Sequence, residues 1–357
     1  MFNARTEELI KALEPYKGKR VFVAVLGSPD PDGLASAWAL QILAREIGVS
    51  MDLLTFEVIS RPDNVTFAKI LDIPFRQVTD HLPRAGYAGY AVVDRQNVGL
   101  PVPHKARLPV IAHIDHHASV ATDAVFMQQE TSIGSTCSIM AFHLQYLLKN
   151  SAIPPAELCR LATALMHGIR TDTADFVTCN PVDFEAAAIL APHVSIEHSY
   201  TLVNAPLGKA FIDTLTTVLQ SCTKQNGIIV SYAGKISRRA RDTIAQSADF
   251  LMRTEDTKTV VVFGLINDNF VGSLRSSSPI FDPYDFLDTA LSTSLKTPVD
   301  CGGRTFAGGF QIPLKLMPTP DIEASRQLIQ EMILNEWSIR SAPKPKGSRK
   351  KKGGKKV

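Results

Sequence analysis

Short apolar runs that alternate with segments of helical periodicity restrict the fold of this chain more than any other feature. In the first half, buried strands are predicted at 20–27, 51–56, 88–94 and 109–114. Helical patterns lie at 4–15, 33–47, 134–149 and 155–169. Alternation of this kind indicates an α/β fold, with a parallel sheet that carries helices on both faces.

The second half of the chain starts the pattern again. Strands are predicted at 227–233, 259–266 and 269–277, and the last two are expected to pair across the turn at Asn267 and Asp268. Helices are predicted at 207–222, 238–251, 283–294 and 320–337. We therefore expect two domains, 1–205 and 206–338, with the helix 207–222 as connector and a smaller α/β second domain.

Composition excludes several classes of protein. The 357 residues suffice for two cores, and no apolar run reaches the roughly 18 residues that a membrane span needs. The N-terminus is charged and lacks the apolar segment of a secretory signal. The five cysteines are odd in number and form no Cys-x-x-Cys pair, which disfavours a disulfide framework or a cysteine zinc site. A soluble, cytoplasmic protein without a membrane partner is expected.

Positive charge is concentrated at the C-terminus. Residues 344–356 carry eight Lys or Arg residues and no acid, so a net charge of +3 leaves the rest of the chain net negative. The segment 339–357 is predicted to be a disordered basic tail. Such a tail could hold RNA or DNA nonspecifically through phosphate contacts, or it could be only a solubilising terminus, and the sequence leaves both open.

Acidic and histidine side chains follow the predicted strands and one helix of the first domain. They are Asp30, Asp32, Asp94, Asp115, His116, His117 and Asp172. An aspartate in such a place is more often a helix cap or a turn former than a metal ligand. Ligands of parallel sheets bind beyond the carboxyl ends of the strands, however, where these residues are expected to meet. Carboxylates with an imidazole suit Mn²⁺, and Mg²⁺ is an alternative.

These residues carry a resemblance to the DHH phosphoesterase superfamily. Its signature motifs are similar to 28–37 (SPDPDGLASA), 93–94 (VD), 115–117 (DHH) and 168–173 (GIRTDT). The DHHA1 substrate domain of the family resembles the second half, at 272–277 (GSLRSS) and at 302–304 (GGR) with 307–310 (AGGF). The likeness spans about 20–315 and is nearest to the RecJ-like exonucleases and the oligoribonuclease and pAp-phosphatase branch.

The resemblance implies a role for each residue. Two manganese sites would be held by Asp30, Asp32, Asp94, His116 and Asp172, with Asp94 bridging both. Asp115 would orient a histidine, and His117 would face the substrate phosphate as donor or acid. Substrate binding would involve Arg275, Ser276, Gly302, Gly303, Arg304, Gly308 and Gly309. The active site is expected in a cleft between the domains.

Two positions depart from the family pattern. Leu26 stands where relatives have a metal-binding histidine, which weakens the first site unless another ligand replaces it. His167 is a candidate replacement, although a histidine near a helix end more often bonds a carbonyl group, and His113 is expected to be structural. Arg304 stands where well-known relatives have a histidine, and an arginine cannot act as acid or base near neutral pH.

The sequence thus predicts a hydrolase that cleaves short oligonucleotides or small nucleotides such as 3′-phosphoadenosine 5′-phosphate (pAp) with metal-activated water. A catalytically impaired nucleotide-binding regulator is the alternative that Leu26 suggests. A factor that binds nucleic acid through the basic tail is a third. The substrate, the cleavage polarity and the formation of a homodimer stay open.

Overall fold

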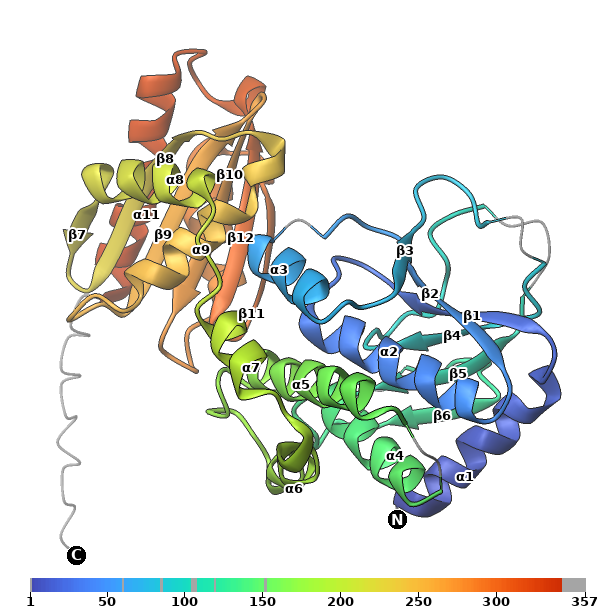
Figure 1. Cartoon of the computed structure of the whole chain (residues 1–357). Coiled ribbons are helices and arrows are strands. Elements are labelled where there is room, and N and C mark those ends of the chain that lie inside the picture. Colours follow the sequence, from blue (N-terminus) through green and yellow to red (C-terminus); the bar gives the residue numbers. More distant parts are fainter. Residues whose placement is uncertain are drawn as a thin grey trace, which may run out of the picture. The chain divides into compact units, whose positions relative to one another are not determined.

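The computed structural model describes residues 2–59, 61–83, 86–103, 108–118, 120–150 and 153–341, except for the side chains of Asn150 and Arg304. The chain divides into two compact units, Met1–Pro206 and Leu207–Val357 (Figure 1). Most of the expected basic tail, 342–357, lies outside the described residues. Its first residues, 339–341, are helical because the last helix continues to Ser341.

The first unit is built on a six-stranded sheet in which every pairing is parallel. The strand order is β3-β2-β1-β4-β5-β6. The strands are β1 (Arg20–Val25), β2 (Ser50–Thr55), β3 (Phe75–Gln77), β4 (Tyr90–Val93), β5 (Val110–Asp115) and β6 (Phe126–Gln129). β1, β4 and β5 are neighbours, so the polar residues that follow these three strands come out side by side.

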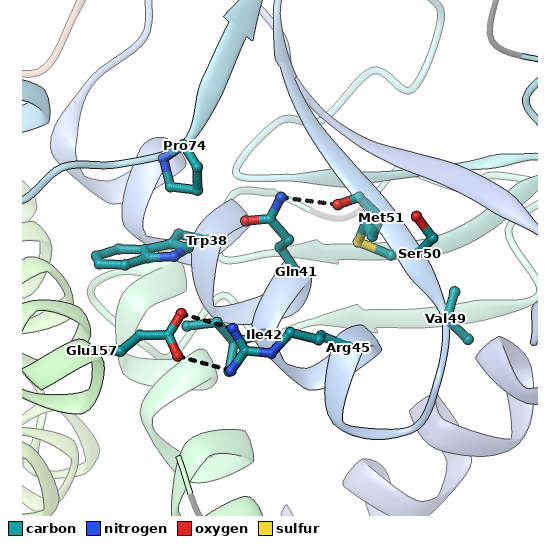
Figure 2. A pocket seen from close by; sticks show the side chains of 9 residues that line it. All are labelled: Trp38, Gln41, Ile42, Arg45, Val49, Ser50, Met51, Pro74 and Glu157. Atoms are coloured by element: carbon teal, nitrogen blue, oxygen red, sulfur yellow. Dashed lines mark hydrogen bonds and ion pairs between the residues drawn. The ribbon is translucent and has the colours of Figure 1, made fainter. Parts of the chain in front are cut away.

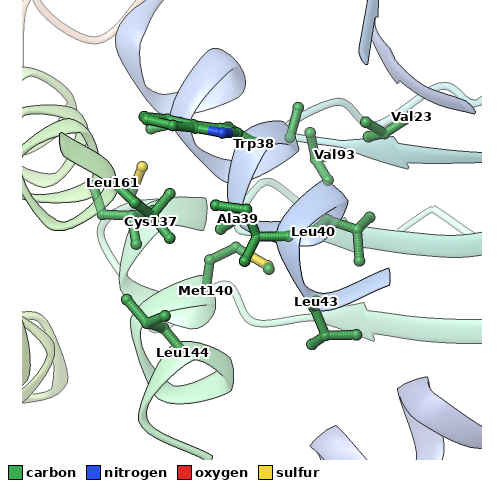
Figure 3. Packing of buried hydrophobic residues seen from close by; sticks show 14 of the residues in the cluster. Val23, Trp38, Ala39, Leu40, Leu43, Val93, Cys137, Met140, Leu144 and Leu161 are labelled. Atoms are coloured by element: carbon green, nitrogen blue, oxygen red, sulfur yellow. The ribbon is translucent and has the colours of Figure 1, made fainter. Parts of the chain in front are cut away.

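The helices of this unit lie on one face of the sheet. They are α1 (Phe2–Leu13), α2 (Pro31–Glu46), α3 (Pro62–Ile70), α4 (Thr136–Asn150), α5 (Pro155–Asp172), α6 (Pro181–Leu190) and α7 (Ile196–Val203). α1 and α2 lie against the strands, and others pack on these two helices. α2 is buried along most of its length, because it packs between the sheet and the pair α4 and α5. Figure 3 shows Leu40 and Leu43 of α2 in the same apolar cluster as Val93 of β4, Met140 of α4 and Leu161 of α5. α2 therefore carries apolar side chains all round, as a fully buried helix must.

The opposite face of the sheet differs from the expectation of helices on both faces. Its apolar side chains, such as Phe22, Leu54 and Val92, pack with residues of loops, including Val78 and Val102. No described residue of this second cluster comes from a helix. The loops that follow β3 and β4 therefore cover this face, which helices cover in a doubly wound sheet.

The second unit is a mixed six-stranded sheet of order β11-β12-β10-β9-β8-β7, in which only β8 and β9 are parallel. Its strands are β7 (Thr223–Gln225), β8 (Ile228–Lys235), β9 (Thr259–Ile266), β10 (Asn269–Ser276), β11 (Asp300–Arg304) and β12 (Ala307–Pro313). One apolar cluster lies between the sheet and α8 (Lys209–Ser221) with α9 (Asp242–Leu251). Another lies between the sheet and α10 (Pro283–Asp288) with α11 (Ile322–Ser341). An α/β second domain is confirmed.

The glycine-rich segment of this unit is a β-hairpin, not the loop that its composition suggests. Gly302 pairs with Gly309, and Gly303 pairs with Gly308. A Cβ atom at Gly308 would lie 2.8 Å from the Cβ of Pro283, so close packing of α10 on the hairpin accounts for that glycine. The sequence pattern did not predict these two strands, because glycine is depleted in strands unless another element approaches closely.

A cavity with a volume of about 310 Å³ lies between α2, β2 and α5 (Figure 2). Arg45 closes one side of it by donating two hydrogen bonds of 2.8 Å to Glu157. These bonds from Arg45 lower the pKa of Glu157. The cavity holds no cluster of metal ligands among the described residues, because its one carboxylate is already paired. None of the described helices combines the length and the apolar character of a membrane span.

Candidate metal centre

The structure brings the predicted acidic and histidine residues together at the carboxyl ends of β1, β4 and β5. Asp30 and Asp32 begin α2, Asp94 follows β4, His116 follows β5, and Asp172 ends α5. These residues therefore come from four separate loops or helix ends of one unit, and the sheet topology is what makes them neighbours.

Asp30 and Asp32 are held by the start of two helices. Asp30 caps α2 by accepting a hydrogen bond of 3.0 Å from the backbone N–H of Gly33. Asp32 is buried and accepts from the backbone N–H groups of Thr136 (2.8 Å) and Cys137 (2.7 Å), at the N-terminus of α4. Burial, followed by the charge of neighbouring Asp172, raises the pKa of Asp32 to about 6. The Asp32 carboxylate is therefore held in place, but its negative charge is unfavourable in the buried site unless a cation binds.

Asp94 has a left-handed backbone, with φ of 53°, which aspartate tolerates better than most residues. Its Oδ1 accepts a hydrogen bond of 3.3 Å from Thr136 Oγ1, and its backbone N–H donates to Ile114. Burial is the main reason why the pKa of Asp94 lies well above its ordinary value, and the charges of Asp32 and Asp30 add to it. Asp94 thus faces other carboxylates that repel it.

His116 points into the middle of this acidic cluster. Its Nε2 lies 3.0 Å from Asp172 Oδ2, 3.6 Å from Asp94 Oδ1 and 4.0 Å from Asp32 Oδ2. Nε2 is buried yet makes no aligned hydrogen bond in the described structure, so the short approach to Asp172 is an ion pair of poor hydrogen-bond geometry. Burial acts to lower the pKa of His116, but the surrounding carboxylates raise it to about 9.

His117 is positioned by Asp115. The Nδ1 of His117 lies 2.7 Å from Asp115 Oδ1, and the backbone N–H of His117 donates to the same oxygen at 3.2 Å. Asp115 is fully buried, and although burial acts to raise its pKa, these bonds from His117 lower it. Because Nδ1 of His117 is bonded to Asp115, its Nε2 stays free to contact a ligand. The His117 side chain is 39% exposed, so a ligand can reach it.

The donor set fits a divalent cation. Two groups of side chains, Asp32–His116–Asp172 and Asp94–His116–His117, each bring their ligand atoms within 4.8 Å of one another. Carboxylates of raised pKa and a buried imidazole nitrogen without a hydrogen bond are what a cation would satisfy. Oxygen ligands with one imidazole suit Mn²⁺ and Mg²⁺ better than soft metals.

Close helix packing shapes the floor of this centre. A Cβ atom at Gly168 of α5 would overlap Cys137 Sγ and would lie 3.2 Å from the Cα of Asp32. Glycine therefore lets α5 approach the start of α2, which brings Asp172 to His116. The sequence motif contained Gly168, but only the packing shows why that position excludes a larger residue.

The predicted substrate residues of the second unit are already engaged in part. Arg275 of β10 donates Nε to Asp249 Oδ1 at 2.6 Å and Nη1 to Ser273 Oγ at 2.8 Å. Ser276 is buried, and its Oγ bonds to Thr259 and to the carbonyl oxygen of Lys258. Gly302 is exposed on the edge strand β11, with open space where a side chain would stand. The side chain of Arg304 lies outside the described residues.

The residues at the doubtful positions have structural surroundings. Leu26 is a buried member of the loop-covered apolar cluster, so it supplies no ligand. His167 stacks on Phe67 with ring centroids 5.3 Å apart, and burial lowers its pKa to about 4. His113 is buried, with Nε2 2.7 Å from the carbonyl oxygen of Arg95, which confirms its structural role.

Two features of the centre were missed from sequence. The N-terminus of α4 supplies three hydrogen bonds to the cluster, from Thr136 and Cys137. The exposed Arg95 lies against Gly27, where a Cβ atom would stand only 2.9 Å from its Nη1. Gly27 has a φ of +81°, and a glycine next to a motif can indicate such a backbone conformation from sequence alone. The position of Arg95 next to Asp94 in the sequence gave no indication that Arg95 lies at the centre.

Comparisons with known proteins agree with this architecture. No protein-family model matches the chain. It is 31% identical over 311 residues to an uncharacterized protein from Methanocaldococcus jannaschii, and the match covers 86% of this chain but only 61% of that protein. The chain therefore spans about three fifths of the length of this curated relative.

Two solved structures share the fold. An exopolyphosphatase-related protein from Bacteroides fragilis superposes with a TM-score of 0.61 at 12% identity, covering 94% of this chain and 97% of that one. The exonuclease RecJ bound to manganese superposes with a TM-score of 0.52 at 14% identity, covering 96% and 95%. The chain therefore shares the fold of these two proteins.

Proposed function

We propose that this chain is a divalent-metal-dependent phosphoesterase that hydrolyses short oligonucleotides or small nucleotides such as pAp. The observation that carries the proposal is the meeting of Asp32, Asp94, Asp172 and His116 around a buried nitrogen that has no hydrogen bond. Structural support of this kind is independent of the motif resemblance, because the residues are distant in sequence. Mn²⁺ is the proposed physiological ion, and Mg²⁺ is the alternative.

Asp32, Asp172 and His116 would hold one ion, and Asp94 with His117 would extend the centre on the other side of His116. Asp30, whose charge acts on Asp94, would add a further carboxylate. When bound, divalent ions lower the pKa of water and polarise a phosphoryl oxygen. Asp32 keeps its orientation through the α4 backbone, so it need not reorganise during the reaction. His116 must be neutral to bind an ion, which makes ion affinity depend on pH.

The remaining groups of each unit would bind and orient the substrate. His117, fixed by Asp115 through Nδ1, is placed to donate or hold a proton at Nε2. Arg95 has an exposed guanidinium beside Gly27 and can pair with a phosphate oxygen. Arg275 would have to exchange its bond to the exposed Asp249 for one to substrate. The edge strand with Gly302 and Gly303 would offer backbone N–H groups.

The test is hydrolysis by the full chain of RNA of two to five nucleotides, of pAp and of pyrophosphate, with Mn²⁺ and with Mg²⁺. We expect Mn²⁺-dependent release of mononucleotides or phosphate that is lost in Asp94→Ala. Absence of hydrolysis with every substrate and both ions would reject an enzyme and would favour the impaired regulator. Product that forms equally in the Asp94→Ala chain would point to a contaminant.

Leu26 decides between one and two ions. Because Leu26 belongs to an apolar cluster, we expect one tightly bound ion per chain and a second of lower affinity. Counting bound Mn²⁺ by electron paramagnetic resonance checks this. A gain of second-ion affinity in Leu26→His would show that the natural position limits the site, whereas two ions of equal affinity in the wild type would contradict the expectation.

A further inference from the structure

The second unit contains a basic cavity at the end of the sheet opposite Arg275. It has a volume of about 210 Å³ and is lined by Arg238 and Arg241, with Asn267, Asn269 and Gln311. A water molecule takes about 30 Å³ in the liquid, so a phosphate group fits with room for water. Two guanidinium groups and three amides are a donor-rich lining of the kind that binds oxyanions.

The two arginines have no carboxylate partner among the described residues. With the part of the chain that the structure describes, neither makes an ion pair or a side-chain hydrogen bond, and the described lining of the cavity contains no acidic residue. The acids nearest in sequence, Asp242 and Asp268, are not among the lining residues. Arg275, Arg326 and Arg340 of the same unit each pair with a carboxylate, so Arg238 and Arg241 differ from those three arginines.

The cavity and Arg275 lie on the same face of the sheet. Side chains alternate along a strand, so Asn269, Val271, Ser273 and Arg275 of β10 share one face. That face packs against α9, since Val271 belongs to the apolar cluster of α9 and Arg275 pairs with Asp249 of that helix. Residues of antiparallel strands rise about 3.4 Å each, which separates the cavity from Arg275 by about 20 Å.

Small residues lie between these two basic sites. Ser273 of β10 faces Gly309 of β12, and Gly309 faces Gly302 of the edge strand β11. Val271 of β10 is covered by α9, but Gly309 and Gly302 add no side chain to the face at β12 and β11, so an extended ligand can lie along these two strands. Phosphates follow one another about every 3.4 Å along one strand of a stacked helix, so about six nucleotides cover the separation, and fewer suffice when the strand is extended.

We infer that the Arg238–Arg241 cavity binds a backbone phosphate of a single-stranded oligonucleotide whose other end is held near Arg275. The inference deepens the proposed function and depends on it for the second anchor. Inorganic polyphosphate has the same repeated phosphates, but it offers no donor to the amide oxygens of Asn267 and Gln311, whereas nucleotides do. The chain would then favour oligonucleotides over pAp, which is too short to reach both sites.

The experiment measures binding by fluorescence anisotropy in EDTA, so that hydrolysis does not interfere. The full chain is compared with Arg238→Gln/Arg241→Gln, and with Arg239→Gln as matched control, because Arg239 is exposed but does not line the cavity. We expect at least about tenfold weaker binding of a labelled RNA of about ten nucleotides by the double variant. Binding of a labelled dinucleotide should change by less than about twofold in both variants.

Salt dependence distinguishes phosphate binding from a general decrease in affinity. The slope of log affinity against log salt should fall by about 0.7 for each phosphate that the double variant no longer neutralises. Arg238→Lys/Arg241→Lys keeps the charge and should keep the slope. Ten-nucleotide binding as tight in the double glutamine variant as in Arg239→Gln would overturn the inference. So would polyphosphate binding that needs these arginines while RNA binding does not.

A parallel assay of hydrolysis with Mn²⁺ separates this inference from the proposed function. If the wild type cleaves RNA and the double variant shows a raised KM for long substrates only, with kcat kept, both stand. If the wild type cleaves nothing, the proposed function fails, and the anisotropy result still decides whether the cavity binds a phosphate.

Discussion

At the residue scale, the carboxylates of the metal centre repel one another, and a bound cation would reduce this repulsion. Asp94 carries a pKa raised by burial and by neighbouring carboxylates, so at neutral pH its charge opposes folding in the absence of metal. The Asp94→Asn variant removes that charge, and asparagine tolerates the left-handed backbone of this position. We expect its melting temperature in EDTA to exceed that of the wild type by at least about 2 °C.

The same variant should lose its response to metal. Mn²⁺ at a hundred times its dissociation constant stabilises a protein by about 2.7 kcal/mol, and this gain should be present in the wild type and absent in Asp94→Asn. Differential scanning calorimetry with and without Mn²⁺ measures both effects. A variant that melts below the wild type in EDTA would show that Asp94 stabilises the fold by its own contacts.

A second residue, His143, makes the first unit sensitive to acid. Its ring is buried between Thr6 Oγ1 (2.8 Å) and Gln128 Oε1 (3.1 Å), and burial, with a minor effect of Arg5, lowers its pKa to about 3. The unfolded chain takes up a proton near pH 6.5, where the folded chain cannot. Stability from His143 is therefore fully present above pH 6.5 and is lost as pH falls toward 3.

Urea unfolding at pH 7 and at pH 5 tests this assignment. The free energy of unfolding should drop on the order of 2 kcal/mol more in the wild type than in His143→Gln over this interval. His81→Gln, at an exposed histidine, is the matched control and should keep the wild-type drop. Equal drops in all three chains would mean that other groups govern the acid response.

At the element scale, the approach of α5 to α2 fixes the geometry of the centre. In an exposed helix Gly→Ala stabilises by about 1 kcal/mol, but at Gly168 the new methyl group would overlap Cys137 Sγ. We expect Gly168→Ala to destabilise by about 1–3 kcal/mol and to weaken Mn²⁺ binding, because Asp172 moves away from His116. Calorimetric titration and denaturant unfolding measure the two effects.

The double variant Gly168→Ala/Cys137→Ala serves as control for this packing. Removing the sulfur gives the methyl group space, so part of the stability and part of the Mn²⁺ affinity should be recovered. If Gly168→Ala alone raises stability, as it would in an open helix, the close approach of these helices is refuted.

Helices and strands could be predicted from the sequence where the spacing of apolar residues matches the periodicity of the element that forms. The run TVVVFGLI predicts a strand at 259–266, and the structure has β9 at Thr259–Ile266. The hairpin of β11 and β12 was missed because its glycines resemble a loop, and their reason is the packing of Pro283. The metal cluster was predictable because acids follow strands, but Thr136 and Cys137 act through backbone N–H groups, which no sequence pattern displays.

At the scale of the whole molecule, the metal centre belongs to one unit. Two of the four apolar clusters lie wholly in residues 1–206 and two wholly in the second unit. We expect residues 1–206, expressed alone, to bind Mn²⁺ with a dissociation constant within about threefold of that of the full chain. Hydrolysis of RNA should fall at least about tenfold, because the arginines of the second unit are absent.

A fragment that folds, as judged by circular dichroism, yet binds no Mn²⁺ would place a ligand outside the first unit. A fragment as active as the full chain would remove the second unit from substrate binding. Either result would change which unit binds the metal or the substrate, but it would leave the description of the fold unchanged.

The central claim is that carboxylates and an imidazole from four segments form one divalent-metal centre. Anomalous diffraction at the manganese edge, from crystals grown with Mn²⁺, tests it most directly. The account predicts an anomalous peak at coordination distance, about 2 Å, from Asp32, Asp172 and His116. The absence of a peak among these side chains at saturating Mn²⁺, or a peak bound only elsewhere on the chain, would contradict it.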